Sequence, residues 1–220
     1  MDFQCPRCMG LVVTPNTEHH KASLMLETGV ELECVYRFCY LSDMIEAGGG
    51  AELASIVRVR CAWGKFWKLS GFLIGRGVSL KLKGKIYNAC VQSVMVYGSE
   101  TWSMRVEDQQ RLERKKRMMI RLMCGVSVRD KISSDELRHR SGFDCASVIV
   151  RRNRLRWFGH VERKTEDDWV KKCQSVQVEG KVGRGRGRKT WIECIRGDMK
   201  NLNLSMEEVV DRDVWEKENF

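Results

Sequence analysis

Apolar side chains recur three or four positions apart through most of the chain after residue 50, which is the spacing of one face of an α-helix. Ser79 is a typical N-cap residue and Gly98 a typical helix stop. The two prolines both precede residue 16, so the strongest helix breaker is absent from the remainder. The pattern predicts long helices at residues 51–73, 80–97, 106–124, 148–163 and 190–201, and shorter ones after Ser133 and Ser205.

The same spacing assigns a buried face to each long helix, while Arg58 is expected to point outward. Trp63 and Trp67, four positions apart, share a face, where core packing is the ordinary role and stacking on bases the rarer one. The residues expected to be buried are Leu53, Ile56, Val57, Cys61, Ala62, Phe66 and Leu69, then Leu82, Ile86, Ala89, Cys90, Val94 and Tyr97, then Leu112, Met119, Ile120 and Met123, then Val148, Leu155, Phe158 and Val161.

Ahead of the helices, residues 30–46 are rich in β-branched and aromatic side chains and are followed by three glycines. That composition predicts a short β-hairpin. We therefore expect a mainly α fold, a helical bundle with an N-terminal β-hairpin and a flexible Gly/Arg loop. The predicted divisions are a disordered Cys-rich remnant and linker at 1–29, the hairpin at 30–50, a helical region at 51–165, and a basic loop with C-terminal helices at 166–220.

Cationic side chains cluster on two of the predicted helices. In the helix at 148–163 the first acid is Glu162, and in the helix at 106–124 the basic side meets only Glu113. The guanidinium fork matches phosphate oxygens, so these clusters predict phosphate binding. A solvated basic face beside a core helix is the alternative. The residues concerned are Arg111, Arg114, Lys115, Lys116, Arg117 and Arg121, and Arg151, Arg152, Arg154 and Arg156 with Trp157, which packs or stacks.

A third basic segment, Lys181–Lys189, alternates glycine with arginine and has no apolar side chain beyond Val182. Such a segment has little to bury, so we expect a mobile loop. Its cations reach phosphates or a narrow minor groove, and a solvated linker is the alternative. The cations are Arg184, Arg186, Arg188 and Lys189.

The chain as a whole is basic. Its 220 residues contain 39 Lys and Arg against 29 Asp and Glu, a formal net charge of +10, which predicts a polyanionic partner. The sequence has neither a signal peptide nor an apolar run near the roughly 20 residues that a membrane helix needs. Most of the ten cysteines are scattered singly, typical of reduced core thiols. We therefore expect an intracellular protein, nuclear or cytoplasmic, without a membrane partner and of undetermined oligomeric state.

Cys5 and Cys8 have the spacing of a metal-binding pair. Structural zinc takes four ligands, and only His19 and His20 follow nearby, so the pair predicts an incomplete zinc site. Another reading is that they are the last two ligands of a larger finger. No other cofactor is expected on this chain.

Four motifs follow one another between residues 97 and 191. They are Y-G-S-E-T-W (Tyr97–Trp102), R-L-E-R-K-K-R-M-M-I-R (Arg111–Arg121), L-R-W-F-G-H-V-E-R (Leu155–Arg163) and G-R-G-R-K-T-W (Gly185–Trp191). In this order and approximate spacing they resemble the region that follows the palm in reverse transcriptases of non-LTR (LINE-type) retrotransposons.

The resemblance implies a role for each part. F-C-Y-L-S-D-M-I (Phe38–Ile45) is similar to the hairpin at the end of the palm that grips the primer, with Ser42 in place of the usual glycine. The helices after it would form the thumb, which holds the template–primer duplex. Cys5 and Cys8 would end a finger that some relatives carry, and Gly187 stands where proline is common.

The catalytic palm of that family has no counterpart here. Two-metal polymerisation needs paired aspartates on a strand turn, where the parent enzyme would hold Mg²⁺. The one Asp-Asp pair, Asp167-Asp168, lies in a charged stretch without predicted strands. We therefore expect a truncated fragment of an RNA-directed DNA polymerase that keeps the part that binds RNA or DNA and is inactive alone. The alternatives are a non-functional relic of the element and a zinc-dependent interaction module.

Overall fold

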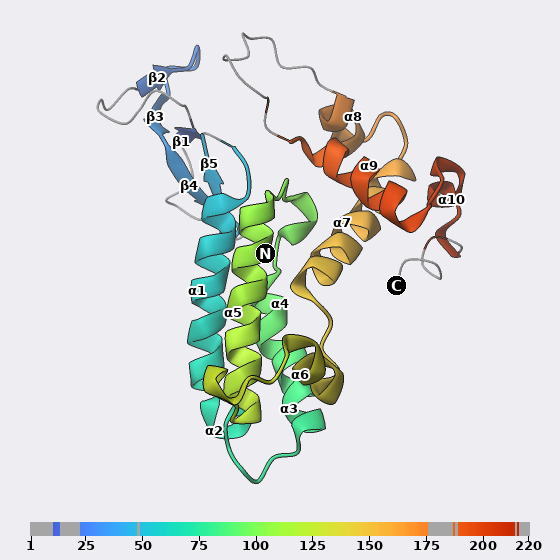
Figure 1. Cartoon of the computed structure of the whole chain (residues 1–220). Helices are drawn as coiled ribbons and strands as arrows, with labels where there is room; N and C mark the ends of the chain where they lie inside the picture. The colour runs from blue at the N-terminus through green and yellow to red at the C-terminus, as the bar shows by residue number, and fades with distance from the viewer. Residues whose placement is uncertain are drawn as a thin grey trace.

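The computed structural model describes residues 11–13, 23–47, 49–175, 187, 189–213 and 215. They form a mainly α fold with β-structure at the N-terminal end of the bundle, as expected (Figure 1). The helices are α1 (Glu52–Lys68), α2 (Ser70–Leu73), α3 (Leu80–Tyr87), α4 (Ser93–Met95), α5 (Val106–Cys124), α6 (Ser134–Ser141), α7 (Ala146–Glu162), α8 (Trp169–Ser175), α9 (Trp191–Leu202) and α10 (Met206–Val210).

The β-structure consists of two small sheets. β4 (Arg37–Tyr40) and β5 (Asp43–Glu46) form the expected antiparallel hairpin. Its two turn residues, Leu41 and Ser42, both have positive φ (46° and 63°), as a type I′ hairpin turn requires. In the other sheet, β3 (Glu31–Val35) pairs with β1 (Leu11–Val13) and β2 (Ser23–Met25). The expectation of disorder for residues 1–29 therefore does not hold for β1 and β2.

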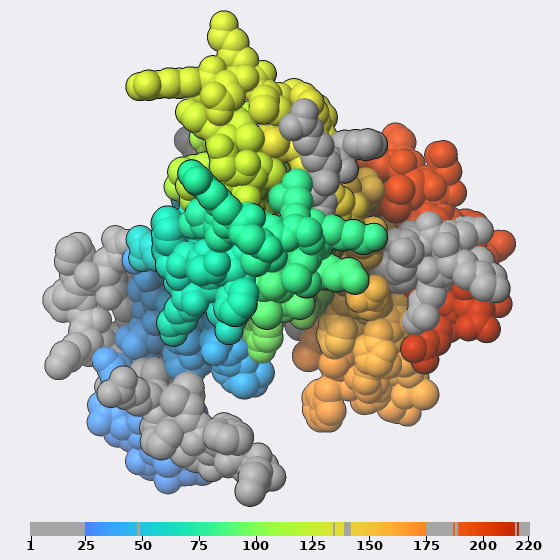
Figure 2. Space-filling view, turned by 90° about the horizontal axis from the view of Figure 1, so that it is seen from below, coloured from blue at the N-terminus to red at the C-terminus, as the bar shows by residue number. Residues whose placement is uncertain are grey.

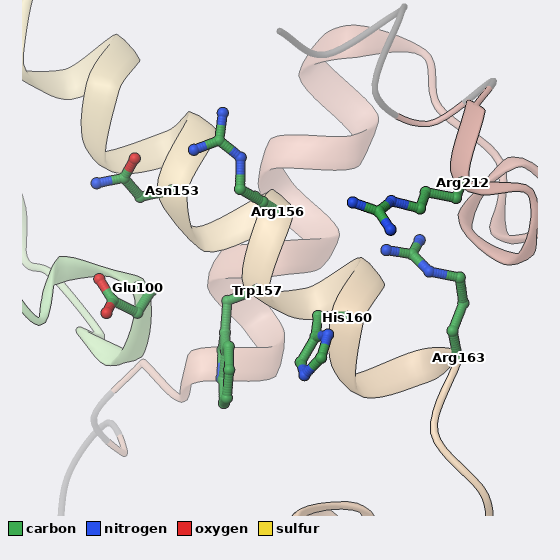
Figure 3. Close-up of a pocket in the computed structure, with 7 residues that line it drawn as sticks. All are labelled: Glu100, Asn153, Arg156, Trp157, His160, Arg163 and Arg212. Atoms are coloured by element: carbon green, nitrogen blue, oxygen red, sulfur yellow. The ribbon is translucent and has the colours of Figure 1, made fainter.

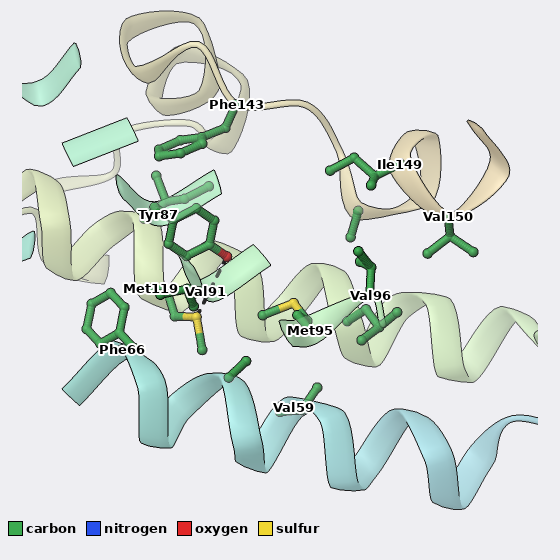
Figure 4. Close-up of a cluster of buried hydrophobic side chains, with 14 of the residues drawn as sticks. Val59, Phe66, Tyr87, Val91, Met95, Val96, Met119, Phe143, Ile149 and Val150 are labelled. Carbon is green, nitrogen blue, oxygen red and sulfur yellow. Dashed lines mark hydrogen bonds between the residues drawn. The ribbon is translucent and has the colours of Figure 1, made fainter. Parts of the chain in front are cut away.

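A bundle core forms where α1, α5 and the α3–α4 segment lie side by side (Figure 1). Tyr87 lies at its centre, with its ring edge against Phe143 and its hydroxyl donating to the sulfur of Met119 (Figure 4). The expected inward face of α5 is confirmed, because Leu112, Met119, Ile120 and Met123 are all buried. Apolar burial on this scale is the main stabilising term in such a bundle.

The expected buried faces of the first two helices are rotated in the structure. Instead of a single helix at 80–97, α3 is followed by a π-helical turn at Asn88–Gln92 and then by α4. The buried residues of this segment are Lys83, Gly84, Tyr87, Val91, Met95 and Val96. The offset from the expected face already exists in α3, before the π-turn, because Lys83 and Gly84 lie inward while Leu82 is exposed. An apolar pattern misplaces the inward face where polar and small residues form it.

In α1 the buried face is built largely from small side chains. Ala54, Ser55 and Ala62 are buried, whereas Cys61 is exposed, which corrects its expected place in the core. Among the described cysteines only Cys194 is buried, and all eight are free thiols. Small residues allow close approach of α1 to α4, which lie in contact in the bundle.

The second core lies among α7, α9 and the C-terminal segment, where Leu155, Phe158, Ile195 and Trp215 are buried. The N-terminal half of α7 belongs instead to the bundle core, so this one helix joins the two clusters. Seen from below, the orange and red C-terminal helices form a lobe beside the green and teal bundle (Figure 2).

The Tyr97–Trp102 motif is a junction between these parts. Gly98 has φ +77°, and a Cβ there would lie 2.8 Å from Oδ2 of Asp43, so the backbone requires glycine. The indole of Trp102 donates to the same carboxylate at 3.2 Å, which joins the hairpin to the motif. The carbonyl of Glu100 accepts from Trp191 at 2.7 Å, which joins α9 to it.

Arg58, expected to face solvent, completes the junction. Its side chain is buried, and its guanidinium lies 4.3 Å from the ring centroid of Tyr97. The guanidinium also donates a hydrogen bond to the carbonyl of Ser42 in the hairpin turn. The Y-G-S-E-T-W motif therefore holds the β-hairpin, the bundle and the C-terminal lobe together.

Candidate nucleic-acid interface

On α5, several of the expected phosphate-binding cations are engaged within the fold. Arg111 donates to Asp108 at 2.8 Å and lies 3.6 Å from Glu52, so the expectation that Glu113 is the only acid near this side is wrong. Arg121 donates to the carbonyls of Ser127 and Ile132. Both side chains hold neighbouring elements in place.

Lys116 is 1 % exposed, which removes it from any surface. Its ammonium donates to Oε1 of Gln92 at 2.7 Å and to the carbonyl of Asp144 at 2.5 Å, so it ties α5 to the loop before α7. Of the α5 cluster, Arg114 and Arg117 remain exposed and Lys115 half-buried. The two arginines donate to main-chain carbonyls one turn back on α5.

On α7, Arg154 is also buried, at 7 % exposure. Its Nε and Nη2 donate to Oδ2 of Asp198 at 2.8 and 2.6 Å, and its Nη1 donates to the carbonyl of Trp102 at 3.1 Å. Arg152 lies 3.5 Å from Asp144, and Arg151 is half-buried. The arginine cluster, whose helix has no acid before Glu162, thus receives two carboxylates from elsewhere in the fold. The expectation that Arg154 contacts a nucleic-acid backbone is incorrect, because its side chain is buried.

Arg156 and Trp157 have a different environment, because both line a cavity of about 720 Å³ on the outer side of α7. The cavity lies between the C-terminal half of α7, the 3-10 turn at Ser99–Thr101 and the segment after α10. Among the described residues, three arginines and one carboxylate line it, so this part of its lining is predominantly positive. Its lining residues are Glu100, Asn153, Arg156, Trp157, His160, Arg163 and Arg212 (Figure 3).

The cavity walls are held by contacts to the rest of the fold. The amide of Asn153 donates to Ser99, and Arg163 donates to the carbonyl of Val209 at 2.9 Å. The ring centroids of Trp157 and His160 lie 5.3 Å apart, and the two ring planes are inclined by 30° (Figure 3). A cationic cavity with an aromatic wall is suited to a phosphorylated ligand that carries a planar ring.

Four of these residues could have been found from the sequence. Asn153, Arg156, Trp157 and His160 are three or four positions apart and so share one helix face. Arg163 continues that face by one more turn. Neither Glu100 nor Arg212 has such a signal, because the fold alone brings them to α7.

The Gly/Arg segment is largely outside the described residues, including Arg184, Arg186 and Arg188, while Lys189 is exposed. Cys5 and Cys8 are outside them too, so the expected zinc site stays a prediction. Where the structure does describe the chain, no group of three or more His, Cys, Asp or Glu side chains is placed to hold a metal ion.

The Asp167-Asp168 pair lies between α7 and α8, without adjoining strands. Asp168 accepts from Lys164 at 2.7 Å and from the backbone N–H of Val170, and these contacts hold the pKa of its carboxyl below the usual range. Asp167 lies 3.5 Å from Lys172. Each carboxylate thus has its own lysine, and the pair does not converge on a shared position.

Trp63 and Trp67 stack on one another with ring centroids 5.9 Å apart. Trp63 packs against the bundle core, which is the ordinary role expected for the pair, whereas Trp67 is 54 % exposed.

None of the described helices combines the length and apolar character needed to cross a membrane. Comparison of the chain with protein-family models, with curated proteins and with solved structures finds no match.

Proposed function

We propose that this chain binds RNA or DNA through phosphate contacts made by the outer side of α7, and that it derives from the thumb and C-terminal region of a non-LTR retrotransposon reverse transcriptase. The chain carries no catalytic residues in this proposal, because the polymerase palm is not among its motifs. Its role is to hold nucleic acid.

The observation that carries the proposal is the cavity beside α7. Arg156, Arg163 and Arg212 line one hollow together with Trp157 and His160. Arginine side chains that line one cavity attract phosphate, and an aromatic wall adds stacking that tolerates any base. The motif L-R-W-F-G-H-V-E-R supplies four of these five side chains, which agrees with the resemblance from which the proposal starts.

Two of the expected cations are left out of the proposed interface. Lys116 and Arg154 are buried and serve the fold, so the proposed binding surface has fewer cations than the sequence predicted. Exposed Arg114 and Arg117 on α5, and Lys189 before α9, are secondary phosphate contacts in this proposal.

The first test removes two cavity cations. In the double variant Arg156→Gln/Arg212→Gln, we expect weaker RNA binding and a shallower salt dependence. The log–log slope should fall by about 0.7 for each lost contact on single strands and about 0.9 on duplex DNA. Fluorescence anisotropy with labelled RNA and DNA, from low to moderate salt, measures both quantities.

The matched control is Lys65→Gln/Arg76→Gln, which removes the same charge from exposed positions on α1 and after α2. It should keep the wild-type slope. Equal losses in the two double variants would mean that only the overall positive charge matters, and the assignment of the interface to α7 would be abandoned. A thermal melt of each variant confirms that the fold is retained.

The second test concerns the Gly/Arg segment. Replacing Arg184, Arg186 and Arg188 with Ala should weaken RNA binding and lower the salt slope by about 0.7 for each phosphate contact that is lost. The same anisotropy titration applies. An unchanged slope would show that this segment takes no part in binding, whatever the outcome for α7.

A further inference from the structure

We infer that the lower end of the bundle, formed by the end of α1, by α2 and by the start of α3, binds the surface of an anionic membrane (Figure 1). The contact is peripheral: cations meet the lipid headgroups, and exposed apolar side chains enter the layer beneath them. The sequence-based expectation of no membrane partner concerned membrane-spanning helices, which such a contact does not need. The inference goes beyond the proposed function and uses no residue of the cavity beside α7.

The first observation is a long stretch of the chain without acids. Residues 53–99 contain eight Lys and Arg and neither Asp nor Glu. Arg58 and Lys83 are buried, and the other six cations are exposed. Within the described part of the chain, none of these six forms an ion pair. They are Arg60, Lys65, Lys68, Arg76, Lys81 and Lys85.

Helix stability accounts for only some of these positions. Lys65 and Lys68 lie in the last turn of α1, where the helix dipole favours positive charge. Lys81, however, lies in the first turn of α3, where the dipole disfavours a cation, and Arg76 lies between α2 and α3. An external anionic surface would stabilise all four.

Large apolar side chains are exposed on the same elements. Trp67 at the end of α1 is 54 % exposed, Phe72 on α2 is 59 % exposed, and Leu82 on the first turn of α3 is 48 % exposed. Since α2 contacts both α1 and α3, the three elements meet at this end of the bundle (Figure 1). Large apolar side chains exposed together mark a site of interaction with a protein or a membrane.

A second part of the chain extends this face. Figure 2 views the molecule from below, and its teal residues stand in front beside the yellow-green residues at the end of α5 and in the turn after it. That turn adds Arg129, Lys131 and Val128, which is 77 % exposed. Its one acid, Asp130, accepts a hydrogen bond from the backbone N–H of Ser127 and so caps the turn. The turn therefore adds both net positive charge and apolar surface.

The helix α6 limits the face on one side. It contacts α3 and begins with two acids, Asp135 and Glu136, of which Asp135 forms an ion pair with Arg138. Because exposed acids are repelled by anionic lipid, we place the edge of the membrane contact at α6.

A lipid surface matches this combination better than two other occupants do. A second copy of the chain would bring the same cations face to face, and like charges oppose that contact. RNA or DNA would satisfy the cations, but Leu82 and Val128 have no ring to stack on a base. Anionic lipid offers negative headgroups above an apolar layer, and clusters of about four to eight Lys or Arg beside exposed Trp, Phe and Leu are typical of binding to it.

The test measures binding of the full chain to lipid vesicles by flotation. The vesicles consist of phosphatidylcholine alone, or with phosphatidylserine at about one lipid in three. We expect binding to the anionic vesicles only, and weaker binding as the salt concentration rises, because salt screens exposed charges. Equal binding to both kinds of vesicle, or binding to neither, would overturn the inference.

Charge variants assign the binding to this end of the bundle. Each cation near an anionic surface contributes about a fivefold gain in affinity, so Lys65→Gln/Arg76→Gln should bind about 25-fold more weakly. The matched control, Arg196→Gln/Lys200→Gln, removes two exposed cations from α9 and should bind as the wild type does. Equal losses in the two double variants would mean that only the overall charge matters, and the assignment would be abandoned.

The apolar contact is tested separately with lipids whose acyl chains are brominated, because bromine quenches an indole that reaches the apolar layer. Fluorescence of the bound wild type should be quenched, and Trp67→Phe should lose most of that quenching. Trp169→Phe, which removes a 79 % exposed indole from α8, should keep it. Quenching that persists in Trp67→Phe would contradict the proposed orientation.

A variant of α2 measures how much the apolar contact contributes. Phe72→Ser should lower the affinity for anionic vesicles by about tenfold. The control Val210→Ser changes an apolar side chain that is 71 % exposed on α10 and should have no effect. A thermal melt of each variant confirms that the fold is retained.

Two more outcomes identify a different occupant or separate the two sites. A dimer that forms without lipid and is abolished by Phe72→Ser, detected by light scattering, would assign this face to a second copy and overturn the inference. Loss of RNA binding together with vesicle binding in Lys65→Gln/Arg76→Gln would assign it to nucleic acid instead. Loss of vesicle binding alone, with the wild-type salt slope for RNA retained, supports a lipid site that is independent of the α7 cavity.

Discussion

Replacing Arg154 with Met is expected to lower the free energy of unfolding by about 3–5 kcal/mol, the usual cost of removing one partner from a buried ion pair. The substitution leaves the Asp198 carboxylate, 14 % exposed, without its cation and the carbonyl of Trp102 without its donor. Both losses act at the contact between α7, α9 and the Tyr97–Trp102 junction. Urea unfolding followed by circular dichroism measures the change.

Two controls distinguish burial from charge. Arg37→Met removes a comparable ion pair whose arginine is 59 % exposed, and it should cost less than about 1 kcal/mol. The double variant Arg154→Met/Asp198→Leu removes both charges and should recover much of the loss. If Arg154→Met were no more destabilising than Arg37→Met, Arg154 would have to be a surface side chain, free to contact phosphate as its sequence context suggested.

The second large effect concerns pH. Burial lowers the pKa of Lys116 to about 8, against the opposing influence of Glu113 and Asp144. In the unfolded chain the same amine keeps its proton up to about pH 10.5. Between these values the unfolded state binds more protons, so the free energy of unfolding should rise with pH. From about pH 8 to about pH 10 the rise should be about 2–3 kcal/mol.

Lys116→Met isolates this contribution, because the methionine has no proton to lose. Urea unfolding at intervals across that range should show the rise in the wild type and not in the variant. Lys115→Met is the matched control, since Lys115 is a half-buried neighbour with no comparable contacts to Gln92 and Asp144, and it should keep the rise. Identical pH profiles for wild type and Lys116→Met would contradict the burial of a charged amine.

Tyr87 sets the upper limit of that measurement. Burial raises the pKa of its phenol above the ordinary value of 10.0, so that the unfolded chain releases this proton first. Above about pH 10 the folded state therefore binds more protons at Tyr87 than the unfolded state does, and stability falls as pH rises further. The two buried groups thus have opposite effects, which separate in pH.

Some of the fold follows from local sequence alone. The helix at 106–124 has the expected bounds and the expected buried residues. Ser79 caps α3, Thr190 and Glu193 form a capping box before α9, and the hairpin forms within residues 30–46. These features depend on neighbours within a few positions, so the local sequence is sufficient to predict them.

The tertiary structure decided which charges belong to the surface. Arg58, Lys116 and Arg154 look like the other basic residues of their helices, yet each meets carbonyls or carboxylates supplied by residues at least 16 positions away. A cation becomes buried only where distant acceptors converge on it, and no pattern within one helix records that convergence.

The candidate site is likewise determined partly by local sequence and partly by the tertiary structure. The sequence alone determined a helix that presents Arg156, Trp157 and His160 on one face. Only the fold added Glu100 from the turn after α4 and Arg212 from the segment after α10, because both positions are far from α7 in the sequence and meet it only by tertiary packing. Helical periodicity fixes a face, whereas the cavity on that face depends on what the rest of the chain places opposite it.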